Sequence, residues 1–300
     1  MSLWNGWIIH RRRGWRPLVL RFYTEIVEDQ IGLLAAGIAF YALLAIFPAL
    51  ASLMAVLGMF LDPTQITGPL AEVIAAMPAS AAQVILDQAT AVASADRQRL
   101  GLAAGIGLVV ALYSTARGMR HLIQGLNVAF DRTESRSFLR RWVTILVLSV
   151  FVVAGVLLGL AAIAVIPLLL ALLPLDQGTQ ALVSALRWVV MFSISVTGIA
   201  VIYRWGPDRR HKTWHWTLPG AVLACLLWVI ASAGFSLYAE NFASYQRSFG
   251  ALAGVIVLLT WLWLSAYILL LGAEVNALIE AVTHGETGGD PLHGEQVPSD

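Results

Sequence analysis

The sequence predicts an all-α, polytopic membrane protein with six transmembrane helices, and three observations predict that fold class. Six apolar runs are long enough to cross a membrane, since a span needs about 20 apolar residues to cover roughly 30 Å of hydrocarbon. Apolar residues make up 59% of the chain and charged residues only 12%, about half the usual charged share of a soluble domain. Basic residues also gather on alternate connections between the runs. The predicted spans lie near residues 32–61, 100–118, 142–173, 182–203, 217–239 and 250–277.

The basic residues predict the orientation of these spans. Fifteen of the 19 lysines and arginines precede the first span or lie in the connections that follow the second and the fourth. They are Arg11, Arg12, Arg13, Arg16, Arg21, Arg117, Arg120, Arg132, Arg136, Arg140, Arg141, Arg204, Arg209, Arg210 and Lys212. Because basic residues near spans stay in the cytoplasm, we expect a multi-pass protein of the inner (plasma) membrane with both termini inside.

The same basic clusters predict partners. We expect them to contact membrane lipids through anionic headgroups at the cytoplasmic face. Nucleic acid is not an expected partner, because the clusters are short and interrupted by spans. The single cysteine excludes an intramolecular disulfide.

The chain divides into three predicted parts. Residues 1–31 form a basic, cytoplasmic N-terminal segment, and residues 32–281 form the six-helix membrane domain. Residues 282–300 form a polar tail rich in glycine and proline, which we expect to be disordered in the cytoplasm.

Three local patterns add detail to this division. Leu18, Phe22 and Ile26 recur every four residues, which predicts either an amphipathic helix on the inner membrane surface or a cytoplasmic extension of the first span. Residues 62–99 form the largest external segment, and their prolines suggest two short helices at the outer face. Pro48 inside the first span predicts a helix kink.

Ionisable residues at the inner ends of spans are candidates for a functional site, because charges in a bilayer are costly and face protein or water. Glu274, with Asn276 two residues later, lies near the end of the last span, and Arg117 and Arg120 close the second. Their similar depth, counted at about 1.5 Å per residue, suggests that Glu274 pairs with Arg117 or Arg120. The simpler interpretation is a carboxylate at the membrane interface that water or a neighbour satisfies.

Other side chains carry weaker signals. Trp228, Trp261 and Trp263 lie in the middle of spans, whereas tryptophan concentrates at membrane interfaces. They either line a lipid-accessible groove or pack against helices and lipid. His211 and His215 have the spacing of two metal ligands on one helix, but the glutamate of the zinc-protease pattern is absent. The sequence therefore predicts no catalytic residue, no metal site and no cofactor.

Three stretches together resemble a known family. They are residues 33–53, 111–131 and 218–280. The most specific elements within and beside them are Phe47–Pro48, the S-x-x-R-G run ending at Gly118, Asn241–Phe242 with Tyr245, and the run LGAEVNA. Over most of residues 20–281 the chain is similar to the YihY/BrkB family of bacterial inner-membrane proteins. Phe249 stands where that family usually has tyrosine.

The resemblance implies a membrane fold whose members have been labelled virulence or serum-resistance factors, ribonuclease BN, or exporters of lipid or lipopolysaccharide precursors. We expect a transporter or lipid-handling protein of the cell envelope, with a lipid or envelope precursor as substrate. The alternative is a non-transporting scaffold for envelope assembly. A ribonuclease is disfavoured, because no carboxylates or histidines cluster as a metal-dependent hydrolase requires. Oligomeric state stays open.

Overall fold

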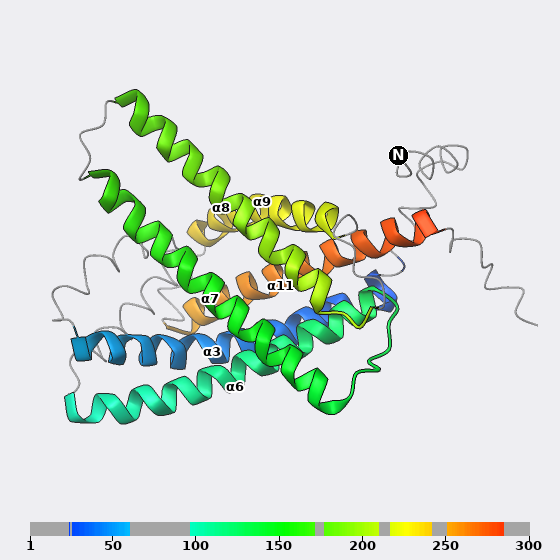
Figure 1. The fold of residues 1–300 in the computed structure, drawn as a ribbon, viewed down its shortest axis with the longest axis horizontal. Helices are drawn as coiled ribbons and strands as arrows, with labels where there is room; N and C mark the ends of the chain where they lie inside the picture. The colour runs from blue at the N-terminus through cyan, green and yellow to red at the C-terminus, as the bar shows by residue number, and fades with distance from the viewer. Residues whose placement is uncertain are drawn as a thin grey trace, which may run out of the picture.

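The structure, a computed structural model, describes residues 24, 26–60, 97–171, 177–209, 217–241 and 251–284. Within these residues the chain is all-helical, as the sequence predicts. The long helices are α3 (Ile31–Phe60), α6 (Arg97–Ala129), α7 (Phe138–Ala171), α8 (Gln177–Trp205), α9 (Leu218–Asn241) and α11 (Ala251–His284) (Figure 1).

Most of these helices have the character of membrane spans. Among the described residues, 5 helices contain a stretch long and apolar enough to cross a membrane, judged by length and composition. These stretches are Ile31–Ala49, Phe138–Val156, Trp188–Trp205, Leu218–Tyr238 and Gly254–Ala281. α6 is not among them, and its helix continues well beyond the predicted span end at residue 118. The sixth span therefore stays a prediction.

Several predicted segments fall largely outside the described residues. They are the start of the amphipathic helix, nearly all of the external segment 62–99, and the end of the C-terminal tail. Residues 26–28 are helical, and Gln30 has a φ of 50°. This left-handed backbone turns the chain just before α3, so residues 26–28 are not a straight continuation of α3.

Helices α3 and α6 lie side by side and antiparallel along their lengths (Figure 1). Glycines allow this close approach. A methyl group added at Gly107 would lie 3.0 Å from the carbonyl oxygen of Pro48, and one at Gly118 would lie 3.5 Å from Cβ of Tyr41. Small residues at such contacts let helix backbones approach closely, which favours association in lipid.

Helices α9 and α11 make an even closer contact. A methyl group at Gly272 would lie 2.6 Å from the carbonyl oxygen of Gly220 and 2.5 Å from the hydroxyl oxygen of Tyr203. That hydroxyl donates a hydrogen bond of 2.5 Å to the carbonyl oxygen of Leu269. The contact therefore joins the end of α8 and the start of α9 to one side of α11.

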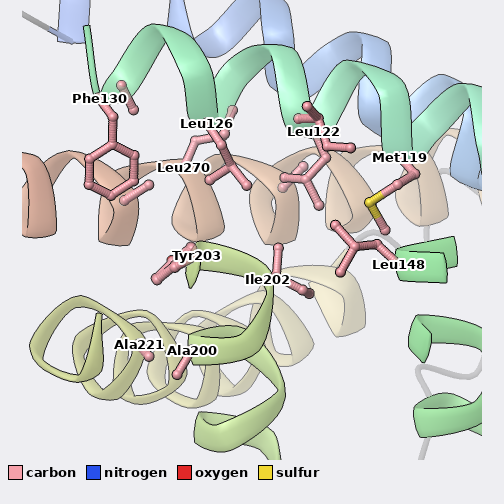
Figure 2. Close-up of a cluster of buried hydrophobic side chains, with 14 of the residues drawn as sticks. Met119, Leu122, Leu126, Phe130, Leu148, Ala200, Ile202, Tyr203, Ala221 and Leu270 are labelled. Carbon is pink, nitrogen blue, oxygen red and sulfur yellow. The ribbon is translucent and has the colours of Figure 1, made fainter. Parts of the chain in front are cut away.

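A cluster of buried apolar side chains holds the helices together (Figure 2). Its α6 members recur at intervals of three or four residues, which places them on one face of that helix. They are Met119, Leu122, Ile123, Leu126 and Ala129, and Phe130 follows directly after the helix. The cluster also contains Leu148 of α7, Ile202 and Tyr203 of α8, Ala221 of α9 and Leu270 of α11. The cluster lies in the half of the bundle where α6, α8 and α11 end.

We expect Gly272→Ala to destabilise the protein by about 1–3 kcal/mol, because the added methyl group meets backbone that cannot move aside cheaply. The matched control is Gly234→Ala on α9, where a methyl group would meet nothing within 4 Å. Thermal unfolding in detergent, followed by tryptophan fluorescence, measures both. Equal melting temperatures for the two variants would contradict the close contact.

Candidate functional site

A charged cavity lies at the end of the bundle where α6, α8 and α11 end and α3, α7 and α9 begin. We call this the basic end, because Arg132, Arg136, Arg140, Arg141, Arg204 and Arg209 lie there. The cavity measures about 190 Å³, far more than the roughly 10–15 Å³ that one water needs. Its lining residues are Asp29, Ala129, Phe130, Asp131, Arg132, Arg209, Glu274, Ala277, Leu278, Glu280 and Ala281. The cavity is therefore large enough for the polar part of a small ligand.

Glu274 of α11 is the most deeply placed acidic residue in the lining. Only 2% of its surface is exposed, although it lies in a strongly apolar helix. Asp131 and Arg132, which follow α6 directly, are exposed and lie nearer to solvent. The cavity thus leads from an exposed, charged mouth to a buried carboxylate.

Arg209 forms another part of the wall. Its Nη1 donates to Oε2 of Glu280 at 2.7 Å, and its Nη2 donates to the carbonyl oxygen of Tyr203 at 2.7 Å. Its guanidinium carbon lies 4.0 Å from the centroid of the Phe130 ring, a cation–π contact. Burial lowers the pKa of Arg209, the Glu280 carboxylate opposes this, and Arg132 adds to the lowering, so the pKa lies below its ordinary value.

A second ion pair lies beside the cavity, between the connection after α6 and the end of α8. Arg136 donates from Nε to Oε1 of Glu134 at 2.6 Å, and from Nη2 to the carbonyl oxygen of Gly206 at 2.9 Å. The Asn127 amide donates to Glu134 at 3.1 Å. Burial tends to raise the pKa of Glu134, but Arg136 and Asn127 outweigh it, and the pKa lies below its ordinary value.

Asp208 connects the same two segments. Its carboxylate accepts hydrogen bonds from the backbone N–H and the hydroxyl of Ser135, at 2.9 and 2.5 Å. Its own backbone N–H donates to the Asn127 side-chain oxygen at 2.8 Å. The connection after α6 is therefore fastened to the connection after α8 at several points.

Asn276 of α11 caps the start of α9. Its side-chain oxygen accepts from the backbone N–H of Gly220 at 2.7 Å, and its amide donates to the carbonyl oxygen of Thr217 at 3.1 Å. The first N–H groups of a helix have no partner within the helix, and Asn276 supplies one from another helix. It is fully buried, so its position beside α9 explains a polar side chain inside this apolar bundle.

The structure does not bring Glu274 together with Arg117 or Arg120, so the suggested pair is wrong. Glu274 shares the cavity wall with Ala129, and Arg117 lies about 18 Å before Ala129 along α6 at 1.5 Å per residue. The Arg117 guanidinium instead lies over the ring of Tyr113, at 5.1 Å from its centroid. Arg120 is exposed. The depths differ because α6 continues beyond the predicted end of its span.

The three mid-span tryptophans do not share one surface. Trp228 and Trp261 meet edge to face with centroids 5.8 Å apart, and Trp228 donates to the hydroxyl of Ser265 at 3.0 Å. Trp263 points to α3, where it donates to the carbonyl oxygen of Gly32 at 3.0 Å. None of them lines the charged cavity.

The remaining sequence candidates are only partly placed. Pro48 lies within α3, which stays helical as far as Phe60, so the kink stays a prediction. Asn241 ends α9, and Tyr245 lies outside the described residues.

Sequence reasoning missed most of the cavity. Asp29, Asp131, Arg132, Arg209 and Glu280 were not singled out as a site, although each lies close to a helix end. The signal that could have found them is their shared position, since all lie outside the predicted spans, on the side where the basic residues gather. Among the described residues, no three histidine, cysteine, aspartate or glutamate side chains are grouped to hold a metal ion.

The fold and the site together define a multi-pass, all-helical membrane protein with a charged cavity at one end. The family model described as virulence factor BrkB matches residues 22–296. The chain belongs to the BrkB family, as the sequence motifs indicated.

Individual relatives agree with this assignment. A ribonuclease-like protein, YfkH, from Bacillus subtilis is 29% identical over 251 residues, which cover 82% of this chain and 88% of the relative. A UPF0761 membrane protein of Pseudoalteromonas atlantica is 26% identical over 285 residues, covering 92% and 91%. One from Xanthomonas campestris is 32% identical over 194 residues, covering 62% and 42%. No solved structure is similar enough to match the chain.

We expect Asn276→Ala to lower the free energy of unfolding by about 1–3 kcal/mol, because it leaves the buried N–H of Gly220 without its acceptor. The control is Thr197→Ala on α8, whose exposed hydroxyl bonds only within its own helix. Unfolding in detergent measures both variants. A stability of Asn276→Ala equal to that of Thr197→Ala would show that the cap contributes nothing.

Proposed function

We propose that this chain is an inner-membrane transporter or lipid-handling protein of the cell envelope, and that the charged cavity receives the polar part of its substrate. The observation that carries the proposal is the position of Glu274, which is buried in an apolar helix and lines a cavity with an exposed mouth. Ionisable residues inside membrane domains face the bundle interior or a water-filled cavity, and they mark substrate or ion pathways. The proposal assigns no catalytic step to the chain.

The proposal includes six spans with both termini in the cytoplasm. α6 lies antiparallel to α3 along its length (Figure 1), which supports a crossing of the membrane in the opposite direction. The arginines of the basic end support its assignment to the cytoplasmic side, because basic residues near spans stay there. The cavity mouth then faces the cytoplasm and the anionic lipid headgroups of the inner leaflet.

The lining favours a substrate with polar or charged groups. Glu274 and Asp29 supply negative charge, and Arg132 and Arg209 supply positive charge. Charges of both signs within one cavity of about 190 Å³ can contact a headgroup that itself carries both. Because the helices around the cavity are apolar on their outer surfaces, the acyl chains of such a substrate can stay in the lipid while its headgroup enters the cavity.

The six-span topology is tested by cysteine labelling in a Cys225→Ser background, which removes the single cysteine. We expect an impermeant maleimide to label Gln98→Cys in intact cells whose outer membrane is permeable. Thr133→Cys should react only after the inner membrane is opened. Labelling of both positions from the same side would show that α6 does not cross.

Transport is tested with purified protein in vesicles of phosphatidylethanolamine and phosphatidylglycerol that contain a trace of fluorescent phosphatidylethanolamine. We expect faster movement of the fluorescent lipid between leaflets than in protein-free vesicles, measured by dithionite quenching. Glu274→Gln should slow it by about tenfold, as loss of one charged hydrogen-bonding group does.

The matched control for Glu274→Gln is Glu134→Gln, which removes a carboxylate that does not line the cavity. Its rate should equal that of the wild type. Movement no faster than in protein-free vesicles would reject lipid handling. Equal slowing by both variants would reject the cavity as the site.

A scaffold for envelope assembly is the second candidate, and one observation favours it. Residues 154–156 of α7 and 188–190 of α8 are exposed at three consecutive positions each. Exposed helix surfaces of this kind can contact lipid or another membrane protein. Co-purification with a defined envelope complex, together with no lipid movement in vesicles, would favour the scaffold.

A further inference from the structure

We propose that the Arg209–Glu280 ion pair is a latch that controls entry to the charged cavity from the basic end. The inference rests on the proposed function, because it assigns regulation to the same cavity. It concerns how the wall of the cavity is held closed, whereas the proposed function concerns what the cavity binds.

The first observation is the place of the pair. Both residues line the cavity, and Nη1 of Arg209 lies 2.7 Å from Oε2 of Glu280. The pair therefore closes a stretch of wall between the connection after α8 and the last turns of α11. The Arg209 side chain is 3% exposed and that of Glu280 is 20% exposed, so Glu280 is the partner closer to solvent.

The second observation is that Arg209 draws three helix ends together. Its guanidinium contacts Phe130 at the end of α6, the carbonyl oxygen of Tyr203 near the end of α8, and Glu280 in α11. The contacts with Phe130 and Tyr203 do not involve α11. Of these three contacts the ion pair is the one with α11, so breaking it releases the guanidinium from that helix.

The third observation is that the neighbouring segment is already one unit. Arg136 bonds to Gly206, and Asp208 bonds to Ser135, so the connections after α6 and after α8 are fastened to each other. At the cavity mouth this unit meets α11 through Arg209, while Tyr203 holds the end of α8 to Leu269, about 16 Å before Glu280 along α11 at 1.5 Å per residue. Separation of Arg209 from Glu280 therefore releases the unit at the mouth and leaves the deeper contact in place.

The test measures how easily the cavity is reached. In the Cys225→Ser background, Ala277→Cys places a single thiol in the cavity lining. The full-length protein is held in lipid nanodiscs, which expose both faces, and the rate of reaction with an impermeant maleimide is recorded. We expect Glu280→Gln to raise this rate by about tenfold, because it removes one charge-assisted hydrogen bond from the wall.

The chain offers a matched control in its other ion pair at the basic end. Glu134→Gln breaks the pair with Arg136, and neither residue lines the cavity. It should leave the labelling rate of Ala277→Cys unchanged. An unchanged rate in Glu280→Gln, or an equal rise in Glu134→Gln, would overturn the latch.

Two further measurements keep the result clear. If Glu280→Gln does not fold, Glu280→Asp keeps the charge on a shorter side chain and should raise the rate by a smaller factor; no rise would again overturn the latch. Lipid movement is recorded separately in vesicles. A faster labelling rate without lipid movement supports the latch and rejects the function, whereas lipid movement with an unchanged labelling rate rejects the latch alone.

Discussion

Close backbone contact between helices is the constraint on which this structure depends. Lipid tails are as apolar as leucine, so burying apolar side chains gives little drive for helices to associate in a membrane. Gly220 and Gly272 let α9 and α11 meet at backbone distance, and Gly107 does the same for α6 at Pro48. The hydrogen bond from Tyr203 to Leu269 and the cap supplied by Asn276 are possible only at such distances. Larger side chains at these glycines would separate the helices and leave buried polar groups without partners.

The basic end is stabilised differently, by groups that must compensate for leaving water. A buried ion pair gains attraction only against a large desolvation penalty, and Arg209 offsets that penalty with three kinds of contact. Glu280 neutralises its charge, the carbonyl oxygen of Tyr203 accepts a hydrogen, and the Phe130 ring covers its face. The pair of Arg136 and Glu134 is buried to a similar extent, with side chains that are 5% and 17% exposed. Its value is positional, because it fixes the connection after α6 against Gly206.

The class of fold could be predicted from the sequence because apolar length and charge placement are local properties. The depth of a side chain within the bundle could not be predicted, because it depends on which residues of two neighbouring helices lie level with each other. A methyl group at Gly125 would lie 2.7 Å from the Leu270 side chain, and this register puts Glu274 beside Ala129 and away from Arg117. The sequence placed Asn276 beside Glu274 near the end of the last span, yet its partners at the start of α9 are visible only in three dimensions. Nothing in the sequence around Asp29 and Glu280 distinguishes them from other charged residues near span ends. Only the folded structure shows that they line one cavity.

The cap that Asn276 places on α9 limits how the bundle can change shape. Any sliding of α11 along α9 would remove the Asn276 oxygen that accepts from the first turn of α9. These two helices therefore move together as one rigid body. Trp263 of α11 donates a hydrogen bond to Gly32 near the start of α3. This bond attaches α3, and α6 packed along it, to the same rigid body. A displacement of α11 therefore carries α9 and the start of α3 with it, and the cavity lining that α11 contributes moves with all three.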